Sequence, residues 1–232
     1  MASVITEPQR PAIPVAGTSD SFPVRRVYCV GRNYAAHARE MGADPTREPP
    51  FFFMKPSDTV HLVPEGKTVE HPYPSQSKDY HFEIELVAFL GKGGRDIPVE
   101  KALDCVWGYA IGLDMTRRDL QQQAKDLRRP WELGKGADFS APVGPVHPVA
   151  KVGHPAKGAI SLTVDGKVRQ KADLSDMIWS VAEQISYLSA YFELKAGDVI
   201  FAGTPEGVGK VERGQTMVGA IEGLGEIRLK VV

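Results

Sequence analysis

Apolar residues in this chain occur mostly in short runs that end at glycine, proline or other turn residues. Runs of this length, rich in Val, Ile and Phe, are typical of strands rather than helices. They indicate a sheet-rich protein. The predicted strands cover residues 24–30, 51–56, 82–90, 106–114, 160–165, 198–203 and 226–232.

Two segments carry a helical pattern instead. Apolar residues recur at helical spacing over 174–191, and Ser175 is a residue type that caps a helix start. Residues 33–42 predict a short helix with Asn33 as its cap. With many strands and few helices, the expected class is mixed α+β and β-rich. A sandwich, barrel or rolled sheet fits this pattern better than a doubly wound α/β fold.

The chain has 232 residues, which suits one domain, and its 42% hydrophobic and 25% charged content is that of a globular protein. Residues 1–20, rich in Pro, Ala, Ser and Thr, predict a flexible N-terminal arm before a single domain over 21–232. No apolar stretch is long enough to span a bilayer, and the first residues do not resemble a secretory signal.

Charge and cysteine content narrow the expected partners. The net charge is −1, which gives no support for nucleic acid or an anionic membrane as a partner. Cys29 and Cys105 both lie in apolar runs, where reduced core thiols of a cytoplasmic protein are expected. The sequence therefore favours a small-molecule ligand and a cytoplasmic location.

Two glutamates stand out inside an apolar run. Glu83 and Glu85 are two positions apart in a predicted strand, so their side chains share one face. Buried side by side, two carboxylates repel each other and lose hydration, and a divalent cation removes both penalties. Asp114, in a similar run, is the expected third ligand. All-oxygen ligands suit Mg²⁺ or Mn²⁺, with Ca²⁺ as a substitute. The alternative is a glutamate pair on an exposed strand edge.

Further side chains with catalytic potential occur in short motifs. His37 and Glu40 are three apart on a predicted helix, so the carboxylate can orient the imidazole as a general base; the alternative is a surface pair. Arg118 and Gln121, also three apart, could bind a carboxylate. Lys135 lies between two glycines and could stabilise an oxyanion. Thr204 follows a predicted strand in a glycine-rich turn.

Six ordered motifs together resemble the fumarylacetoacetate hydrolase family. The resemblance runs from about residue 24 to the C-terminus. The motifs are G-R-N-Y-x-x-H-x-x-E at 31–40, F-M-K-P at 53–56, E-I-E-L at 83–86, L-D-M-T-x-R-D-x-Q at 113–121, G-K at 134–135 and G-T-P-x-G-V-G at 203–209. The resemblance implies a mixed β-sandwich roll, usually a homodimer. It places a metal triad on Glu83, Glu85 and Asp114, and a His–Glu dyad on His37 and Glu40. It places a catalytic lysine on Lys135, and the ligand-contacting residues on Arg118, Gln121 and Thr204.

The chain lacks the additional N-terminal domain of the larger fumarylacetoacetases and is similar to the compact acylpyruvate hydrolase branch. This resemblance implies hydrolysis of the C–C bond of a 3-acylpyruvate. The expected substrate is fumarylpyruvate from gentisate degradation, which gives fumarate and pyruvate. Arg32, Arg47 and Arg117 are candidates to bind the far carboxylate of such a substrate. Oxaloacetate decarboxylation, a hydroxymuconate-type isomerisation or decarboxylation, and a non-catalytic binding role remain alternatives.

Overall fold

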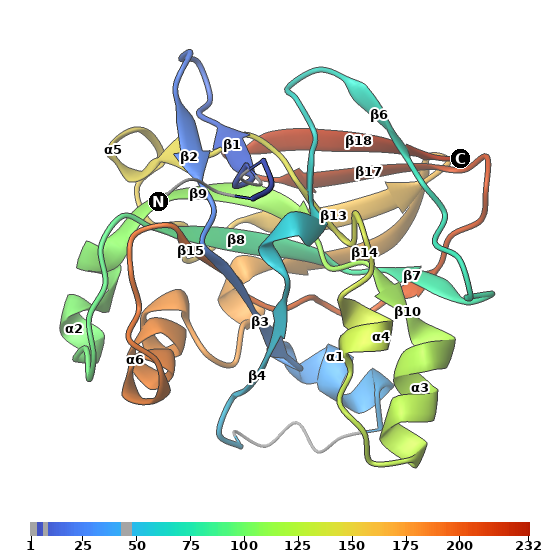
Figure 1. Ribbon diagram of the computed structural model, residues 1–232, viewed down its shortest axis with the longest axis horizontal. Coiled ribbons are helices and arrows are strands. Elements are labelled where there is room, and N and C mark those ends of the chain that lie inside the picture. Colours follow the sequence, from blue (N-terminus) through green and yellow to red (C-terminus); the bar gives the residue numbers. More distant parts are fainter. Residues whose placement is uncertain (1–3, 7–8, 43–47) are drawn as a thin grey trace.

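The computed structural model describes residues 4–6, 9–42 and 48–232. Within them, strands outnumber helices, as the sequence predicts, and the fold is mixed α+β (Figure 1). The helices are short: α1 (Ala35–Glu40), α2 (Val99–Ala102), α3 (Arg118–Asp126), α4 (Glu132–Lys135), α5 (Val149–Val152) and α6 (Val181–Tyr191).

The largest sheet is rolled. It contains, in spatial order, β4 (Phe51–Lys55), β3 (Arg26–Gly31), β15 (Asp198–Phe201), β8 (Ile84–Leu90), β9 (Val106–Leu113), β11 (Ala141–Val143) and β5 (Val60–Leu62), and β12 (His147–Pro148) pairs with β9. Its two edge strands, β4 and β5, are joined by only residues 56–59. This short connection requires the edges to approach each other, so the sheet curls around its own inner face.

A five-stranded sheet packs on the outer face of this roll. Its order is β14 (Lys167–Asp173), β13 (Ala159–Val164), β17 (Thr216–Ile221), β18 (Gly225–Val231) and β6 (Thr68–His71). A small third sheet contains β10 (Thr116–Arg117), β7 (Tyr80–Phe82) and β16 (Gly209–Lys210). The structure therefore confirms the predicted β-rich sandwich roll.

Strand β8 separates two apolar cores, which explains why every residue of it is buried. Leu86 and Ala88 face the core between the two large sheets. Val87 and Phe89 face the inside of the roll, where side chains from all seven main strands of the sheet meet. Side chains alternate along a strand, so Glu85 and Glu83 lie on the same side as Val87, at the end of the inner core.

The predicted strand over 82–90 is interrupted at Glu83. Residues 80–82 belong to the small sheet as β7, and β8 begins at Ile84. The backbone at the break is still paired, because the carbonyl of Glu83 accepts the Asp114 N–H at 2.8 Å and the Ile84 N–H donates to Gln170 Oε1 at 3.0 Å. The interruption lets the chain change sheets at the site of the first glutamate.

Both predicted helices start later than the sequence pattern indicates. Residues 174–176 form a separate 3₁₀ turn, and α6 begins at Val181 after a capping box between Ser180 and Glu183. Ser175 as the cap was therefore wrong. Helix α1 begins at Ala35, and the side chain of Asn33 makes tertiary hydrogen bonds instead of capping it.

Part of the predicted N-terminal arm is packed into the fold. Residues 12–14 form β1 (Ala12–Pro14), which pairs with β2 (Ser21–Pro23), and Ile13 is fully buried in the inner core. A flexible arm over 1–20 is therefore wrong for this segment, because Ile13 contributes apolar area that the roll encloses. The boundary of a catalytic domain at residue 21 stays a prediction.

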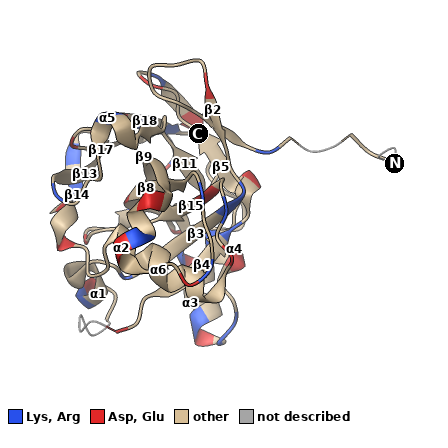
Figure 2. Cartoon of the chain, turned by 90° about the vertical axis from the view of Figure 1, so that its left-hand side faces the viewer, with Lys and Arg blue, Asp and Glu red and all other residues tan. Residues whose placement is uncertain are grey.

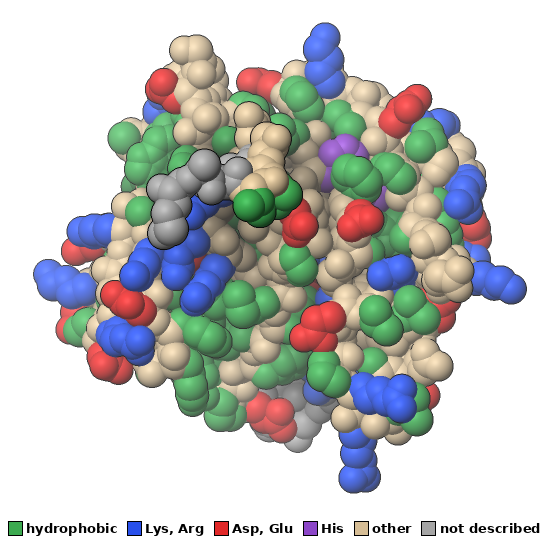
Figure 3. All heavy atoms as spheres, in the orientation of Figure 1, with side chains coloured by type: hydrophobic (Ala, Val, Ile, Leu, Met, Phe, Trp, Pro, Cys, Tyr) green, Lys and Arg blue, Asp and Glu red, His purple; other side chains and the backbone are tan. Residues whose placement is uncertain are grey.

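The surface carries both signs of charge. Lys and Arg are interspersed with Asp and Glu over the elements of the side shown in Figure 2 and on the face shown in Figure 3. Both cysteines are free and buried, as predicted. Within the described part of the chain, no helix has the length and apolar character needed to cross a membrane.

Candidate active site

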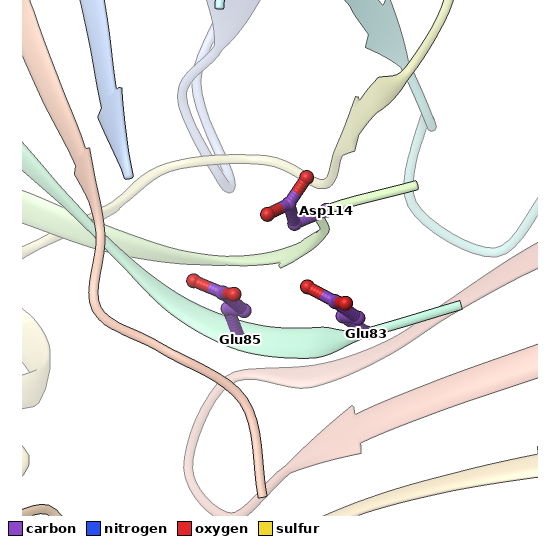
Figure 4. A group of neighbouring side chains, drawn as sticks. All are labelled: Glu83, Glu85 and Asp114. Atoms are coloured by element: carbon purple, nitrogen blue, oxygen red, sulfur yellow. The ribbon is translucent and has the colours of Figure 1, made fainter. Parts of the chain in front are cut away.

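Three buried carboxylates converge where the inner core of the roll ends. Glu83, Glu85 and Asp114 each offer an oxygen that lies within 4.8 Å of the other two (Figure 4). Glu83 and Glu85 come from the β7–β8 segment, and Asp114 directly follows β9, the neighbouring strand. The adjacent antiparallel strands thus bring together residues that are about thirty positions apart in sequence, as the predicted triad requires.

Basic side chains surround two of these carboxylates. Lys135 Nζ lies 2.7 Å from Glu83 Oε2 and 2.7 Å from Asp114 Oδ2. The guanidinium of Arg118 contacts the other oxygen of Glu83. Burial alone would raise the pKa of Glu83, but Lys135, Arg118 and His37 together hold that pKa well below its ordinary value. Glu83 is therefore ionised at neutral pH.

Glu85 has a different environment. Its Oε2 accepts the backbone N–H of Gly203 at 2.7 Å, and no basic side chain of the described residues forms an ion pair with it. Burial, followed by the charges of Asp114 and Glu83, raises the pKa of Glu85 well above its ordinary value. The site holds one carboxylate whose charge is not compensated by the protein.

The donor set fits a hard divalent cation. Lys55 Nζ lies 2.8 Å from Asp114 Oδ1 and also donates to Met115 O, Lys135 O and Ser140 Oγ, so it compensates part of the charge of Asp114. The three buried carboxylates form an all-oxygen set, and Glu85 in it has no ion-pair partner among the described residues. A divalent cation would supply the missing positive charge.

The predicted dyad is formed. His37 Nδ1 lies 3.2 Å from Glu40 Oε2, and the imidazole is buried. Both carboxylate oxygens of Glu40 accept the backbone N–H of Gly207 at 3.1 Å. Glu40 is thus fixed between the helix and the glycine-rich turn, and it holds the ring of His37 in one orientation.

One cavity collects almost all of the predicted residues. Arg118 Nη1 donates to Gln121 Oε1 at 2.7 Å, and Gln170 Nε2 donates to Thr204 Oγ1 at 2.9 Å. Of the predicted triad, dyad, lysine and ligand-contacting residues, Glu40, behind the imidazole, is the one that does not line it. The predicted residues that do are Arg32, His37, Glu83, Glu85, Asp114, Arg118, Gln121, Lys135 and Thr204.

The three arginines considered for a far carboxylate have different positions. Arg32 lines the cavity. Arg117 donates to the carbonyl of Ser75 at 3.2 Å and is not among the lining residues. Arg47 lies outside the described residues. Arg32 is therefore the one of the three that the structure places at the cavity.

Sequence reasoning missed several residues of the site. Lys55 is fully buried beneath it, and its only sequence signal was the F-M-K-P motif. Lys125 lines the cavity, and extending the Arg118–Gln121 face of helix α3 by one turn would have found it. Phe51, Phe53 and Trp131 form an aromatic wall that no local pattern reveals, since Trp131 comes from a distant segment.

The side chain of Asn33 joins two distant segments behind the site by hydrogen bonds. Its Nδ2 donates to the carbonyls of Trp179 at 2.9 Å and Ala202 at 2.7 Å, and its Oδ1 accepts the Trp179 N–H at 2.8 Å. Gly203 has φ +99°, and a Cβ there would lie 2.4 Å from Asn33 Cβ. Only glycine tolerates both the positive φ and the close approach of Asn33. This packing therefore fixes the backbone N–H of Gly203, which donates to Glu85.

Comparison with known proteins agrees with this geometry. Residues 26–232 match the sequence pattern of the family described as fumarylacetoacetate (FAA) hydrolase, C-terminal. The chain belongs to the fumarylacetoacetate hydrolase family.

Three relatives illustrate the chemistry found in the family. The crystal structure of fumarylpyruvate hydrolase from Pseudomonas aeruginosa, in complex with Mn²⁺ and pyruvate, is 60% identical with a TM-score of 0.98, over 100% of this chain and 99% of that one. Fumarylpyruvate hydrolase of Ralstonia sp is 43% identical over 188 residues, 81% of this chain and 95% of the relative. Mitochondrial oxaloacetate tautomerase FAHD1 of Arabidopsis thaliana is 45% identical over 206 residues, 89% and 90% of the two chains.

Proposed function

We propose that this protein is a metal-dependent hydrolase of 3-acylpyruvates that converts fumarylpyruvate to fumarate and pyruvate. The observation that carries the proposal is the meeting of a carboxylate triad and a His–carboxylate dyad in one cavity. The similarity to a fumarylpyruvate hydrolase whose structure contains Mn²⁺ and pyruvate supports both the metal and the substrate.

Glu83, Glu85 and Asp114 would hold the cation, Mg²⁺ or Mn²⁺, with Ca²⁺ as a substitute. When bound, the cation supplies Lewis-acid stabilisation of the pyruvate enolate that leaves when the C–C bond breaks. The two-oxygen head of the substrate, its 1-carboxylate and 2-keto group, would lie beside these residues. Arg118, whose Nη1 donates to Gln121 Oε1 at 2.7 Å, would bind the 1-carboxylate.

The chain's own residues supply the proton chemistry. His37 Nε2 takes a proton from a water molecule while Glu40 holds Nδ1. The hydroxide adds to the distal acyl carbonyl, and the ammonium of Lys135 stabilises the oxyanion. The C–C bond then breaks, so that the acyl carbon becomes a carboxylic acid and the electron pair of the bond leaves with the pyruvate enolate, which takes the proton held by His37 to give pyruvate. General-base catalysis of this kind contributes about 10²–10⁴-fold in rate.

Oxaloacetate is the second candidate substrate. The 45% identity to an oxaloacetate tautomerase favours it, because oxaloacetate carries the same 2-keto acid head. Tautomerisation moves a proton without adding water, and decarboxylation needs only a stabilised enolate. Neither reaction of oxaloacetate requires hydroxide, whereas hydrolysis of an acylpyruvate does. A requirement for the His37–Glu40 dyad therefore distinguishes the hydrolase from the second candidate.

One comparison tests the proposal. The purified protein with Mg²⁺ or Mn²⁺ is assayed on fumarylpyruvate, acetylpyruvate and oxaloacetate, and kcat/KM is measured for each. We expect fumarylpyruvate to give the highest value and Asp114→Ala to abolish all activity. A wild-type protein that turns over oxaloacetate alone would refute the hydrolase and leave the second candidate.

The cellular setting follows from the same inference. Fumarylpyruvate would come from gentisate degradation. A cytoplasmic location is supported by the two free, buried cysteines. We infer a homodimer from the family resemblance, which size-exclusion chromatography with light scattering can test.

A further inference from the structure

Two of the basic groups that line the cavity form no ion pair with its carboxylates. Lys135 and Arg118 form ion pairs with the triad. Arg32 and Lys125 also line the cavity, yet within residues 4–6, 9–42 and 48–232 neither forms an ion pair. Two cations therefore face the cavity without a counter-ion from the described protein.

The two unpaired cations are held next to each other on aromatic rings. The guanidinium carbon of Arg32 lies 5.6 Å from the centroid of the Phe51 ring, and Lys125 Nζ lies 5.3 Å from the Trp131 ring. The two rings contact each other, with centroids 5.6 Å apart and planes at 88°. Cation–π contacts restrain both side chains while their N–H groups stay available to a ligand.

The backbone at Arg32 supports a specific role for this residue. Its φ is +55°, in the left-handed region that an arginine seldom adopts. Such strain clusters at ligand-binding positions, where the surrounding structure enforces it. Gly31 next to it allows close approach of the Phe51 ring, since a Cβ at this position would lie 2.0 Å from Phe51 Cζ.

Lys125 experiences the excess of positive charge directly. Burial, then the charges of Arg118, Arg32 and Lys135, lowers the pKa of Lys125. An anion between Arg32 and Lys125 would relieve this repulsion. Glu83 and Asp114 are already paired with Lys135, and no described carboxylate, Glu85 included, forms an ion pair with Arg32 or Lys125, so the carboxylate of a ligand would supply this negative charge.

We propose that Arg32 and Lys125 form a subsite for the terminal carboxylate of the acyl chain, so that the preferred substrates are acylpyruvates with a second carboxylate. This inference rests on the proposed function and specifies its substrate class. The triad end of the cavity takes the 2-keto acid head, and the Phe51–Trp131 wall borders the flat unsaturated chain between the two ends. Lys125 and Arg32 determine specificity and are not catalytic.

The first test compares two substrates that differ at the far end. Fumarylpyruvate carries a CH=CH–COO⁻ chain on its distal carbonyl, and acetylpyruvate has only a methyl group in place of that chain. A charge-assisted hydrogen bond contributes about 1.5–3 kcal/mol, so we expect Lys125→Met to lower the kcat/KM ratio of fumarylpyruvate to acetylpyruvate by about 10–100-fold, mainly through KM. Lys125→Arg should restore most of the ratio. Lys101→Met, an exposed lysine on helix α2, should change neither substrate.

Arg32 allows a variant that cannot fail through strain. Arg32→Gly removes the guanidinium, and glycine adopts φ +55° at no cost. Its ratio should also fall about tenfold or more, with unchanged thermal stability. Equal losses on both substrates, or an unchanged ratio in both variants, would overturn the subsite.

A binding measurement separates this inference from the proposed function. Fumarate and crotonate share one carbon skeleton, but crotonate lacks the second carboxylate. Calorimetry should give tighter binding of fumarate to the wild-type protein and similar binding of both to Lys125→Met. Fumarate that binds no tighter than crotonate, or not at all, would refute the subsite. A protein that distinguishes the two acids but hydrolyses no acylpyruvate would refute only the function.

Discussion

Glu40 accepts the backbone N–H of Gly207 through both of its carboxylate oxygens, each at 3.1 Å. The two residues are 167 positions apart, and this contact docks helix α1 onto the turn that follows β15. The same carboxylate lies 3.2 Å from His37 Nδ1. The orientation of the proposed base is therefore set by a long-range contact, while the helical spacing of His37 and Glu40 only makes it possible.

Replacing His37 with Ala tests the role of the base. We expect kcat/KM for fumarylpyruvate to fall about 10²–10⁴-fold, because the proposed general base that takes a proton from water is lost. Decarboxylation of oxaloacetate should fall much less, since it needs no hydroxide. Metal content, measured by elemental analysis, should be unchanged. Equal losses of the two activities would contradict the division of labour between the dyad and the triad.

Replacing Gly207 with Ala tests the docking of helix α1. Gly207 has φ +86°, and a Cβ there would lie 2.1 Å from the carbonyl oxygen of Arg169. The turn has to shift and withdraw its N–H from Glu40, so we expect hydrolysis to fall by at least about tenfold. Gly209→Ala is the matched control, because its Cβ makes an ordinary 3.4 Å contact with Phe82. A fully active Gly207→Ala variant would show that this contact does not position His37.

Replacing Lys55 with Met tests the buried charge network. Lys55 is fully buried, donates to three acceptors and compensates the charge of Asp114. Its removal leaves these groups unsatisfied, and we expect the free energy of unfolding to fall by about 3–5 kcal/mol in urea titrations. Lys195→Met, which removes only an exposed pair with Glu193, should change it by less than about 1 kcal/mol. Similar losses in the two variants would argue against the network.

Metal affinity should depend on pH through Glu85. Its raised pKa means that, without metal, Glu85 keeps its proton at pH values where an ordinary carboxyl group is ionised. The cation has to displace this proton when it binds. Affinity should therefore rise with pH until that raised pKa is passed. Folding stability of the metal-free protein should show the opposite trend, with a contribution that is lost as pH rises through the same pKa. Calorimetry in buffers of different ionisation enthalpy measures the released proton, and an absence of proton release would contradict this.

A second pH effect should arise away from the site, at His71. This residue is fully buried, with Nε2 2.9 Å from Tyr80 Oη and Nδ1 3.3 Å from His61 Nδ1. Burial, then the neighbouring His61, lowers the pKa of His71 to about 3. Between pH 6.5 and this value only the unfolded chain binds the proton, so stability should fall with decreasing pH, by up to about 1.4 kcal/mol per unit. Urea unfolding of wild type and His71→Gln checks this, since the variant should have a shallower slope.

The sequence by itself determined the fold class and most of the chemistry. Short apolar runs predicted the strands that form the centre of the roll, and the period of two along a strand placed Glu83 and Glu85 on one face. The helical period placed His37 and Glu40 on one face of a helix, and likewise Arg118 and Gln121. These are local relationships, which backbone geometry fixes within a few residues. Boundaries such as the helix start at Ser180 were missed because nearby Ser175 and Asp173 offer a competing turn.

Only the tertiary structure decided which of these residues meet and how their charges are balanced. The antiparallel pairing of β8 and β9 brings Asp114 beside the glutamates, and the curl of the large sheet places Lys55 of edge strand β4 next to Asp114. The packing of α3 on α4, and of α4 on β4, brings Lys125, Trp131 and Phe51 into one wall. Such contacts join segments far apart in sequence. Their position depends on how apolar faces are buried against each other, which the period of a single segment does not specify.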